Sequence, residues 1–126
     1  MIDADRLILM GELTSLFRER HIADWDGDDA MPITRFSYDL ARKFVDAVPI
    51  GMPMPGVSTT TDGSIEFDWM PSRGRAIGVG IHNSNRLSVA WINGSDRGHC
   101  VMVLNGETLP NELIQLIRSV CGPVHA

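Results

Sequence analysis

The stretch D-G-S-I-E-F-D-W-M, residues 62–70, decides how this chain is built. Asp-Gly readily takes the positive φ angles of a tight type I′ turn, so the stretch is expected to open with one. Beyond the turn, apolar residues alternate with acidic ones, and the apolar set is Ile65, Phe67 and Trp69. This period of two is typical of a half-buried strand. The stretch therefore predicts a hairpin strand with an apolar inner face, whose outer face carries Glu66 and Asp68.

The same period continues on both sides of this strand. Further strands are expected at 57–61, 76–82, 86–92 and 99–104. The last of these has mixed apolarity, so its facing stays open. Because the intervening turns are short, the expected strand order is an antiparallel meander.

Three other segments repeat their apolar residues with the helical period of about 3.6. They lie at about 3–21, 34–48 and 108–121. Thr34 and Thr108 are good N-caps for the second and third helices, and Pro49 ends the second. The sequence therefore predicts one α+β domain over 1–126: two N-terminal helices, a five-stranded antiparallel meander and one C-terminal helix, with the helices covering one sheet face.

Composition limits the possible functions. The 126 residues carry a net charge of -5, which argues against a nucleic-acid binder, since such proteins need a basic field. The acidic N-terminus and the lack of a long apolar run predict neither a signal peptide nor a membrane span. The two cysteines, Cys100 and Cys121, match no metal or disulfide pattern. A cytoplasmic protein is expected, and the absence of nucleotide-binding motifs predicts no cofactor.

A second distinctive stretch is acidic and lies between the first two predicted helices. Its Asp24, Asp26 and Asp28 have the spacing of the first three ligands of an EF-hand calcium loop. The sixth position needs Gly and the twelfth needs Glu, but the chain has Asp29 and Arg35 there. A metal site is therefore not expected at this stretch.

The same stretch also contains large apolar side chains, which a loop retains only if something buries them. Trp25 and Ile33 are expected to pin its two ends to the core while its carboxylates stay in water. The acidic stretch is accordingly predicted to be a packed structural clasp.

The outer face of the predicted sheet is small and polar. If the turns are symmetric, Glu66 lies beside Gly80 and Ser88, and Asp68 lies beside Gly78. Glycine in a central strand often marks the close approach of another group. This face is either simply solvated or a docking surface for a protein partner or a second subunit.

An enzymatic alternative uses the same face. Glu66, Asp68 and His82 are the candidate catalytic residues of a small-ligand-binding protein or hydrolase-like enzyme. A full Ser-His-Asp triad is excluded because Ser64 and Asp68 lie about 13 Å apart along one strand. His99 and Cys100 are neighbours on a strand, so they point to opposite faces and cannot form a nucleophile–base pair.

Three arginines form the last candidate site. In a meander, the turns after the second and fourth strands lie at the same end of the sheet, which brings Arg73, Arg75 and Arg97 together. Such a group suits a phosphate or an acidic partner segment. Scattered solubilising charge is the alternative.

Two motifs in combination resemble a family of small uncharacterised bacterial proteins. They are the W-D-G-x-x-A stretch beginning at Trp25 and the D-G-x-I-x-[LF]-x-W hairpin beginning at Asp62. The resemblance implies a bacterial origin and no chemistry. The leading hypothesis is thus a non-enzymatic interaction domain with an accessory, inhibitory or immunity-like role, which binds a protein partner or its own copy.

Overall fold

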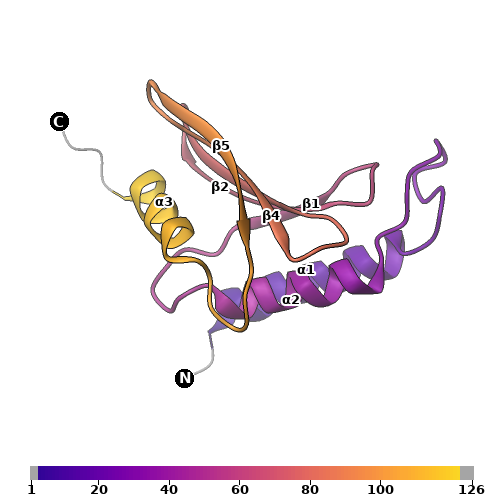
Figure 1. Ribbon diagram of the computed structural model, residues 1–126. Helices are drawn as coiled ribbons and strands as arrows, with labels where there is room; N and C mark the ends of the chain where they lie inside the picture. Colours follow the sequence, from indigo (N-terminus) through magenta and orange to yellow (C-terminus); the bar gives the residue numbers. More distant parts are fainter. Residues whose placement is uncertain (1–2, 123–126) are drawn as a thin grey trace.

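The sheet is a five-stranded antiparallel meander, as the sequence predicts (Figure 1). The computed structural model describes residues 3–122. Its elements are α1 (Ala4–Arg20), α2 (Arg35–Ala47), β1 (Gly56–Thr59), β2 (Ile65–Ser72), β3 (Arg75–Ile81), β4 (Arg86–Asn93), β5 (Asp96–Val103) and α3 (Asn111–Cys121). The strands pair in the order β1-β2-β3-β4-β5. The α+β class and the two-then-one order of the helices are confirmed.

Side-chain caps fix the starts of the first two helices. Asp3 accepts a hydrogen bond of 3.1 Å from the backbone N–H of Arg6, and Thr34 accepts one of 3.1 Å from that of Ser37. The prediction that Thr108 caps α3 is wrong. Pro110 takes the N-cap position with extended backbone angles and no side-chain hydrogen bond. Proline is tolerated there because it has no N–H to leave unpaired.

The β1–β2 hairpin does not close with the expected two-residue type I′ turn. Thr59 pairs with Ile65, so five residues lie between the strands, and among them only Gly63 has a positive φ, of 88°. The Asp62 carboxylate accepts a hydrogen bond of 3.0 Å from the backbone N–H of Ser64. This local hydrogen bond replaces the tight turn with a wider loop, as Asx turns do.

The β4–β5 hairpin is longer than the sequence predicts. Asn93 pairs with Asp96, so the turn has two residues and β5 begins at 96 rather than 99. Met102 is buried and Cys100 packs against the core, whereas His99 is exposed. The facing of β5 is thereby settled, and the separation of His99 from Cys100 is confirmed.

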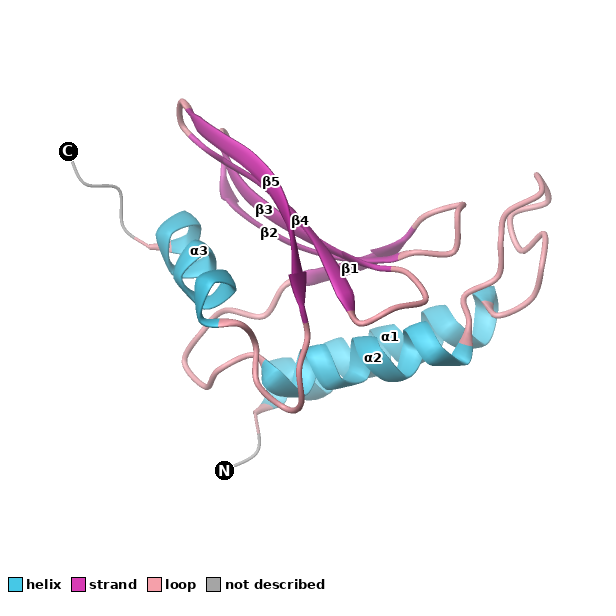
Figure 2. Ribbon diagram, viewed as in Figure 1, coloured by secondary structure: helices cyan, strands magenta, loops and turns pink. Residues whose placement is uncertain are grey.

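Figure 2 shows the arrangement of the helices and the sheet, which one hydrophobic core joins. The buried strand residues of this core are the alternating set Ile65, Phe67, Trp69, Ile77, Val79, Ile81, Leu87, Val89 and Met102. Phe44 of α2 stacks on Phe67 with ring centroids 4.7 Å apart. From α3, Leu113 and Ile117 are fully buried in the same core. The residues between these strand positions therefore lie on the other sheet face.

The acidic stretch packs against the rest of the protein as predicted, but the residues that hold it in place differ in part from those predicted. Ile33 is buried at 2% exposure, and the N–H of Met31 donates to the Thr61 carbonyl at 2.8 Å, which ties the stretch to the β1–β2 loop. Trp25 is only half-buried and lies outside the core. Its indole N–H donates to the Met31 carbonyl at 2.8 Å, and its ring lies 4.6 Å from the Arg20 guanidinium.

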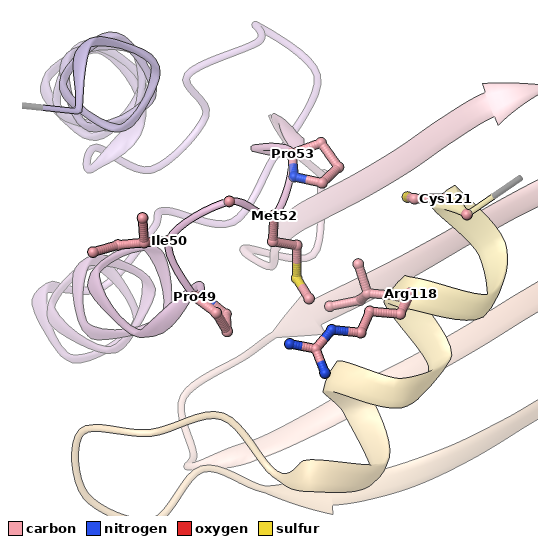
Figure 3. Close-up of a pocket in the computed structure, with 9 residues that line it drawn as sticks. Pro49, Ile50, Met52, Pro53, Arg118 and Cys121 are labelled. Carbon is pink, nitrogen blue, oxygen red and sulfur yellow. The ribbon is translucent and has the colours of Figure 1, made fainter.

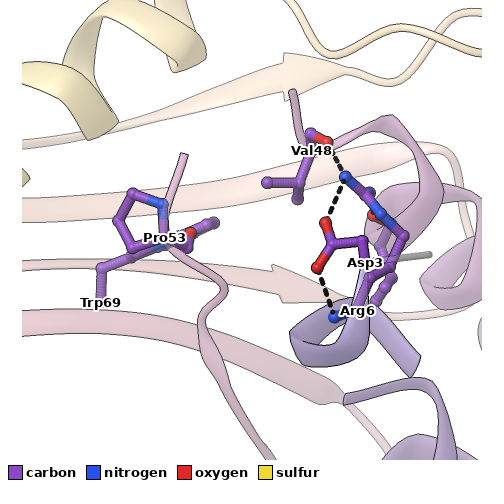
Figure 4. A network of polar contacts seen from close by, with 6 residues as sticks. Asp3, Arg6, Val48, Pro53 and Trp69 are labelled. Carbon is purple, nitrogen blue, oxygen red and sulfur yellow. Dashed lines mark hydrogen bonds and ion pairs between the residues drawn. The ribbon is translucent and has the colours of Figure 1, made fainter. Parts of the chain in front are cut away.

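A second tie joins α1 to α2. The Arg6 guanidinium donates to the carbonyls of Val45 and Val48 at the end of α2, the latter at 2.7 Å, and forms an ion pair of 3.4 Å with Asp3 (Figure 4). Carbonyls in the last turn of a helix lack partners within the helix and attract a cation. Arg6 thus closes the C-terminal end of α2.

Candidate functional site

The outward residues of β2–β5 form the surface that the sequence predicts as a binding site. We call this surface the open face and define it by Glu66, Asp68, Gly78, Gly80, Ser88, Ala90, Ile92, Arg97, His99, Val101 and Val103. Glu66 pairs with Gly80 and Gly80 with Ser88, while Asp68 pairs with Gly78 and Gly78 with Ala90. The predicted register is therefore present in the structure. The structure adds Val101 and His99 of β5 to the ends of these two rows.

The two carboxylates of β2 differ in environment. Asp68 is exposed, whereas Glu66 is half-buried and its carboxylate lies over Gly80. Burial raises the pKa of the Glu66 carboxyl above its ordinary value, and the negative charges of Asp62 and Asp68 add to the shift. Loss of water contacts disfavours the ionised form, and so do nearby like charges. The folded protein therefore disfavours the ionised form of the Glu66 carboxylate.

A shallow hollow of about 350 Å³ lies on the open face. Gly78, Ser88 and Ala90 line it, with Glu66 toward one side of the sheet and His99 and Val101 toward the other. Ser88, Ala90, His99 and Val101 are all exposed. The hollow is half open to solvent and most of its lining is apolar, so it can receive side chains of a partner.

His82 does not join the carboxylates of β2 in the way the enzymatic alternative needs. Its Nδ1 atom lies 3.0 Å from the hydroxyl oxygen of Ser64, and its charge is among the influences that lower the pKa of Asp62. The largest of those influences is the hydrogen bond from the Thr60 hydroxyl. No hydrogen bond joins His82 to Glu66 in residues 3–122. The histidine, which directly follows β3, thus contacts the β1–β2 loop and does not form an acid–base pair on the open face.

The hydroxyl of Ser64 is also poorly placed for catalysis. Ser64 is buried at 7% exposure, and the carboxylate of Asp62 binds the backbone N–H of Ser64 instead of orienting the imidazole. A triad needs the acid on the far side of the histidine from the serine. Ser64, Asp62 and His82 accordingly form a structural loop closure.

The three arginines at the β2–β3 and β4–β5 turns do not share one environment. The two turns lie together as predicted, with the N–H of Gly94 donating to the Gly74 carbonyl at 3.0 Å. Arg75, however, donates to the carbonyls of Ser119 and Gly122 at 3.1 and 2.6 Å and so closes the end of α3. Arg73 and Arg97 remain exposed. Arg75 is thus a structural group, and an anion site of three arginines is not assembled.

The acidic stretch uses its carboxylates to close its own loop. Asp26 accepts from the backbone N–H groups of Asp28 and Ala30 at 2.8 and 3.1 Å, and Asp24 accepts from that of Asp29 at 2.7 Å. The described residues contain no group of three or more His, Cys, Asp or Glu side chains that could hold a metal ion. The carboxylates of Asp24 and Asp26 thus have a structural use.

A cavity of about 390 Å³ lies between residues 49–53 and α3, outside the candidate sites predicted from the sequence (Figure 3). Pro49, Met52 and Ile117 line it together with Arg118 and Cys121. Within residues 3–122, the Arg118 guanidinium makes no ion pair. Burial raises the pKa of the Cys121 thiol, so the thiol is kept in its unreactive protonated form. The cavity offers one cation beside an apolar wall and no nucleophile.

In comparisons with known proteins, no protein-family model, no curated protein and no solved structure matches the chain. The resemblance to small bacterial proteins therefore stays a prediction. In the part of the chain that the structure describes, no helix has the length and apolarity needed to cross a membrane.

Proposed function

We propose that this chain is a non-enzymatic protein-interaction domain that binds a partner through the open face. The observation that carries the proposal is the gathering of exposed apolar side chains there. Ile92, Val101 and Val103 are 39, 60 and 43% exposed, beside the exposed Ala90. Exposed apolar side chains with charged groups beside them are typical of protein–protein interfaces.

Two further features support a binding surface over a simply solvated one. The small residues Gly78, Gly80 and Ser88 allow another backbone to approach the middle of the sheet closely. The half-buried carboxylate of Glu66 lies on this face beside Gly80, although its ionisation is disfavoured. In this proposal the three helices cover the opposite face of the sheet, which leaves the open face free.

The enzymatic alternative has less support. Glu66 borders a hollow that is half open to solvent, and His82 is engaged with Ser64 rather than with Glu66 or Asp68. We therefore assign the chain an accessory, inhibitory or immunity-like role, in the cytoplasm and without nucleic acid, on the strength of its acidic charge and its open face.

Affinity capture with the purified protein as bait tests the proposal. Ala90→Arg places a long charged side chain in the middle of the open face, where residue 90 is exposed and the fold can tolerate it. Arg42→Ala, on the exposed side of α2, is the control bait. A partner retained by the native protein and the control, but lost with Ala90→Arg, supports the proposal. Equal capture by all three baits contradicts it.

A further inference from the structure

The distribution of charged side chains on the open face indicates which kind of partner fits it. The acidic groups Glu66 and Asp68 lie on β2, at one side of the face. The basic groups Arg97 and His99 lie on β5, three strands away at the other side, and both are exposed. Between them, in the rows of Glu66 and Asp68, lie Gly78 and Gly80 of β3 and Ser88 and Ala90 of β4, which are small and uncharged. A surface with acid on one side and base on the other is complementary to a copy of itself.

We infer that the open face pairs with the open face of a second copy of this chain about a two-fold axis parallel to the strands, between β3 and β4. This inference rests on the proposed function and names the partner. An isologous contact of this kind is the commonest form of protein self-association. Two sheets that pack face to face keep their strands roughly aligned, which this axis allows.

The choice of axis follows from the charges. Rotation about an axis parallel to the strands places β2 of one copy over β5 of the second and β3 over β4. Rotation about an axis perpendicular to the strands, within the plane of the contact, would place β2 over β2 and stack Glu66 and Asp68 on their own copies. Like charges in direct opposition cost free energy, so only the first axis is compatible with this face.

The register of the sheet then fixes the contacts. Because the axis parallel to the strands keeps each row opposite the same row, Asp68 of one copy faces His99 of the second. Arg97 lies two residues along the same face, within the reach of a long side chain. The same rotation places Gly78 over Ala90, and Gly80 over Ser88, so the middle of the contact is made of small groups. Each charge contact occurs twice because of the symmetry.

The size of the face places the contact in the class of small interfaces. Four strands about 4.8 Å apart, each presenting about seven residues at about 3.3 Å, give on the order of 450 Å² per copy. A total of roughly 900 Å² lies below the usual range for stable complexes and within that of weak, transient ones. The pairing is therefore expected to be weak and concentration-dependent.

Sedimentation velocity on the full chain from about 10 to about 500 µM tests this inference. The native protein is expected to pass from monomer to dimer over this range. Asp68→Arg and Arg97→Glu each place like charges in opposition and should weaken the dimer at least about tenfold. The double variant exchanges the two charges and should recover the native dimerisation to within about threefold. Asp46→Arg, which makes the same charge change at an exposed position of α2, should leave dimerisation as it is.

Three results would overturn self-pairing through this face. They are a native protein that remains monomeric throughout the range, an equal weakening by Asp46→Arg, and a double variant as weak as the single ones. Circular dichroism of each variant checks that a lost dimer is not a lost fold. The capture experiment with Ala90→Arg decides the proposed function separately, since a foreign partner can occupy the open face even if no dimer forms.

Discussion

The carboxylate of Glu66 lies over Gly80 of the neighbouring strand, with its Oε1 atom 3.2 Å from the position that a Cβ atom at residue 80 would occupy. The absence of a side chain at Gly80 gives the carboxylate room to lie flat on the sheet. The same position removes part of its water, which raises the pKa of Glu66. One glycine thus shapes the surface and, through its neighbour, the electrostatics of the open face.

Glu66→Gln should stabilise the fold near neutral pH. Because the pKa of Glu66 is raised in the folded protein, its stabilising contribution is complete below the unfolded-state value near pH 4 and is lost as the pH rises through the folded-state value. Above that pH the ionised carboxylate opposes folding, and glutamine keeps the shape without the charge. Since the group is partly solvated, the gain at pH 7 should stay below about 1 kcal/mol.

Urea denaturation of both proteins at several pH values between 4 and 8 measures this difference. The free energies of unfolding should converge toward pH 4. Glu107→Gln, in the exposed turn after β5, is the control and should change the free energy of unfolding by less than about 0.5 kcal/mol at every pH. A Glu66→Gln variant less stable than the native protein at pH 7 would show that the carboxylate makes a favourable contact instead.

The sequence predicted the strands and helices well because their periods are a property of many residues together. The alternation around Phe67 was enough to place Glu66 beside Gly80, two strands from Ser88, since register follows once one face must be buried. Helix α2 was equally clear from its apolar stripe and from Thr34. A strand or helix predicted in this way depends little on any one residue that departs from the pattern.

The turns and ties were predicted poorly because each depends on one or two hydrogen bonds. Asp62 widened the β1–β2 loop by binding the N–H of Ser64, and Pro110 displaced Thr108 as the cap of α3. Trp25 packs on Arg20 rather than in the core. The contact from Arg6 to the end of α2 spans about forty residues of chain and has no sequence pattern.

Arg6→Met should destabilise the protein by about 2 kcal/mol. Methionine retains the length of the apolar stem but leaves the carbonyls of Val45 and Val48 without their charged donor, and hydrogen bonds to charged groups are worth about 1.5–3 kcal/mol. Thermal unfolding followed by circular dichroism measures the loss. Arg18→Met, on the exposed side of the same helix, is the control and should change the free energy of unfolding by less than about 0.5 kcal/mol. Equal losses of stability in the two variants would show that the hydrogen bonds from Arg6 to Val45 and Val48 do not stabilise the protein.

Gly98→Ala should destabilise the protein by about 1–3 kcal/mol, as overpacking does. A Cβ atom at residue 98 would lie 2.5 Å from Cζ2 of Trp91, whose rigid ring crosses that position. Gly78→Ala is the matched control, because its Cβ atom would meet only the Phe67 carbonyl oxygen, at 3.9 Å. Urea denaturation should therefore separate two identical changes on neighbouring rows of one sheet. Similar losses for both would show that Trp91 moves aside readily.

Asp26→Ala should cost about 1–2 kcal/mol, whereas Asp28→Ala should be nearly silent. The Asp26 carboxylate accepts two backbone hydrogen bonds, from Asp28 and Ala30, and its removal leaves both N–H groups without a protein partner. The Asp28 side chain is exposed and accepts no hydrogen bond from the residues that the structure describes. The two variants carry the same change of charge, so a difference in their melting temperatures isolates the hydrogen bonds. If Asp28→Ala proved the more damaging, its carboxylate would have to bind something outside this chain, and the acidic stretch would become a site after all.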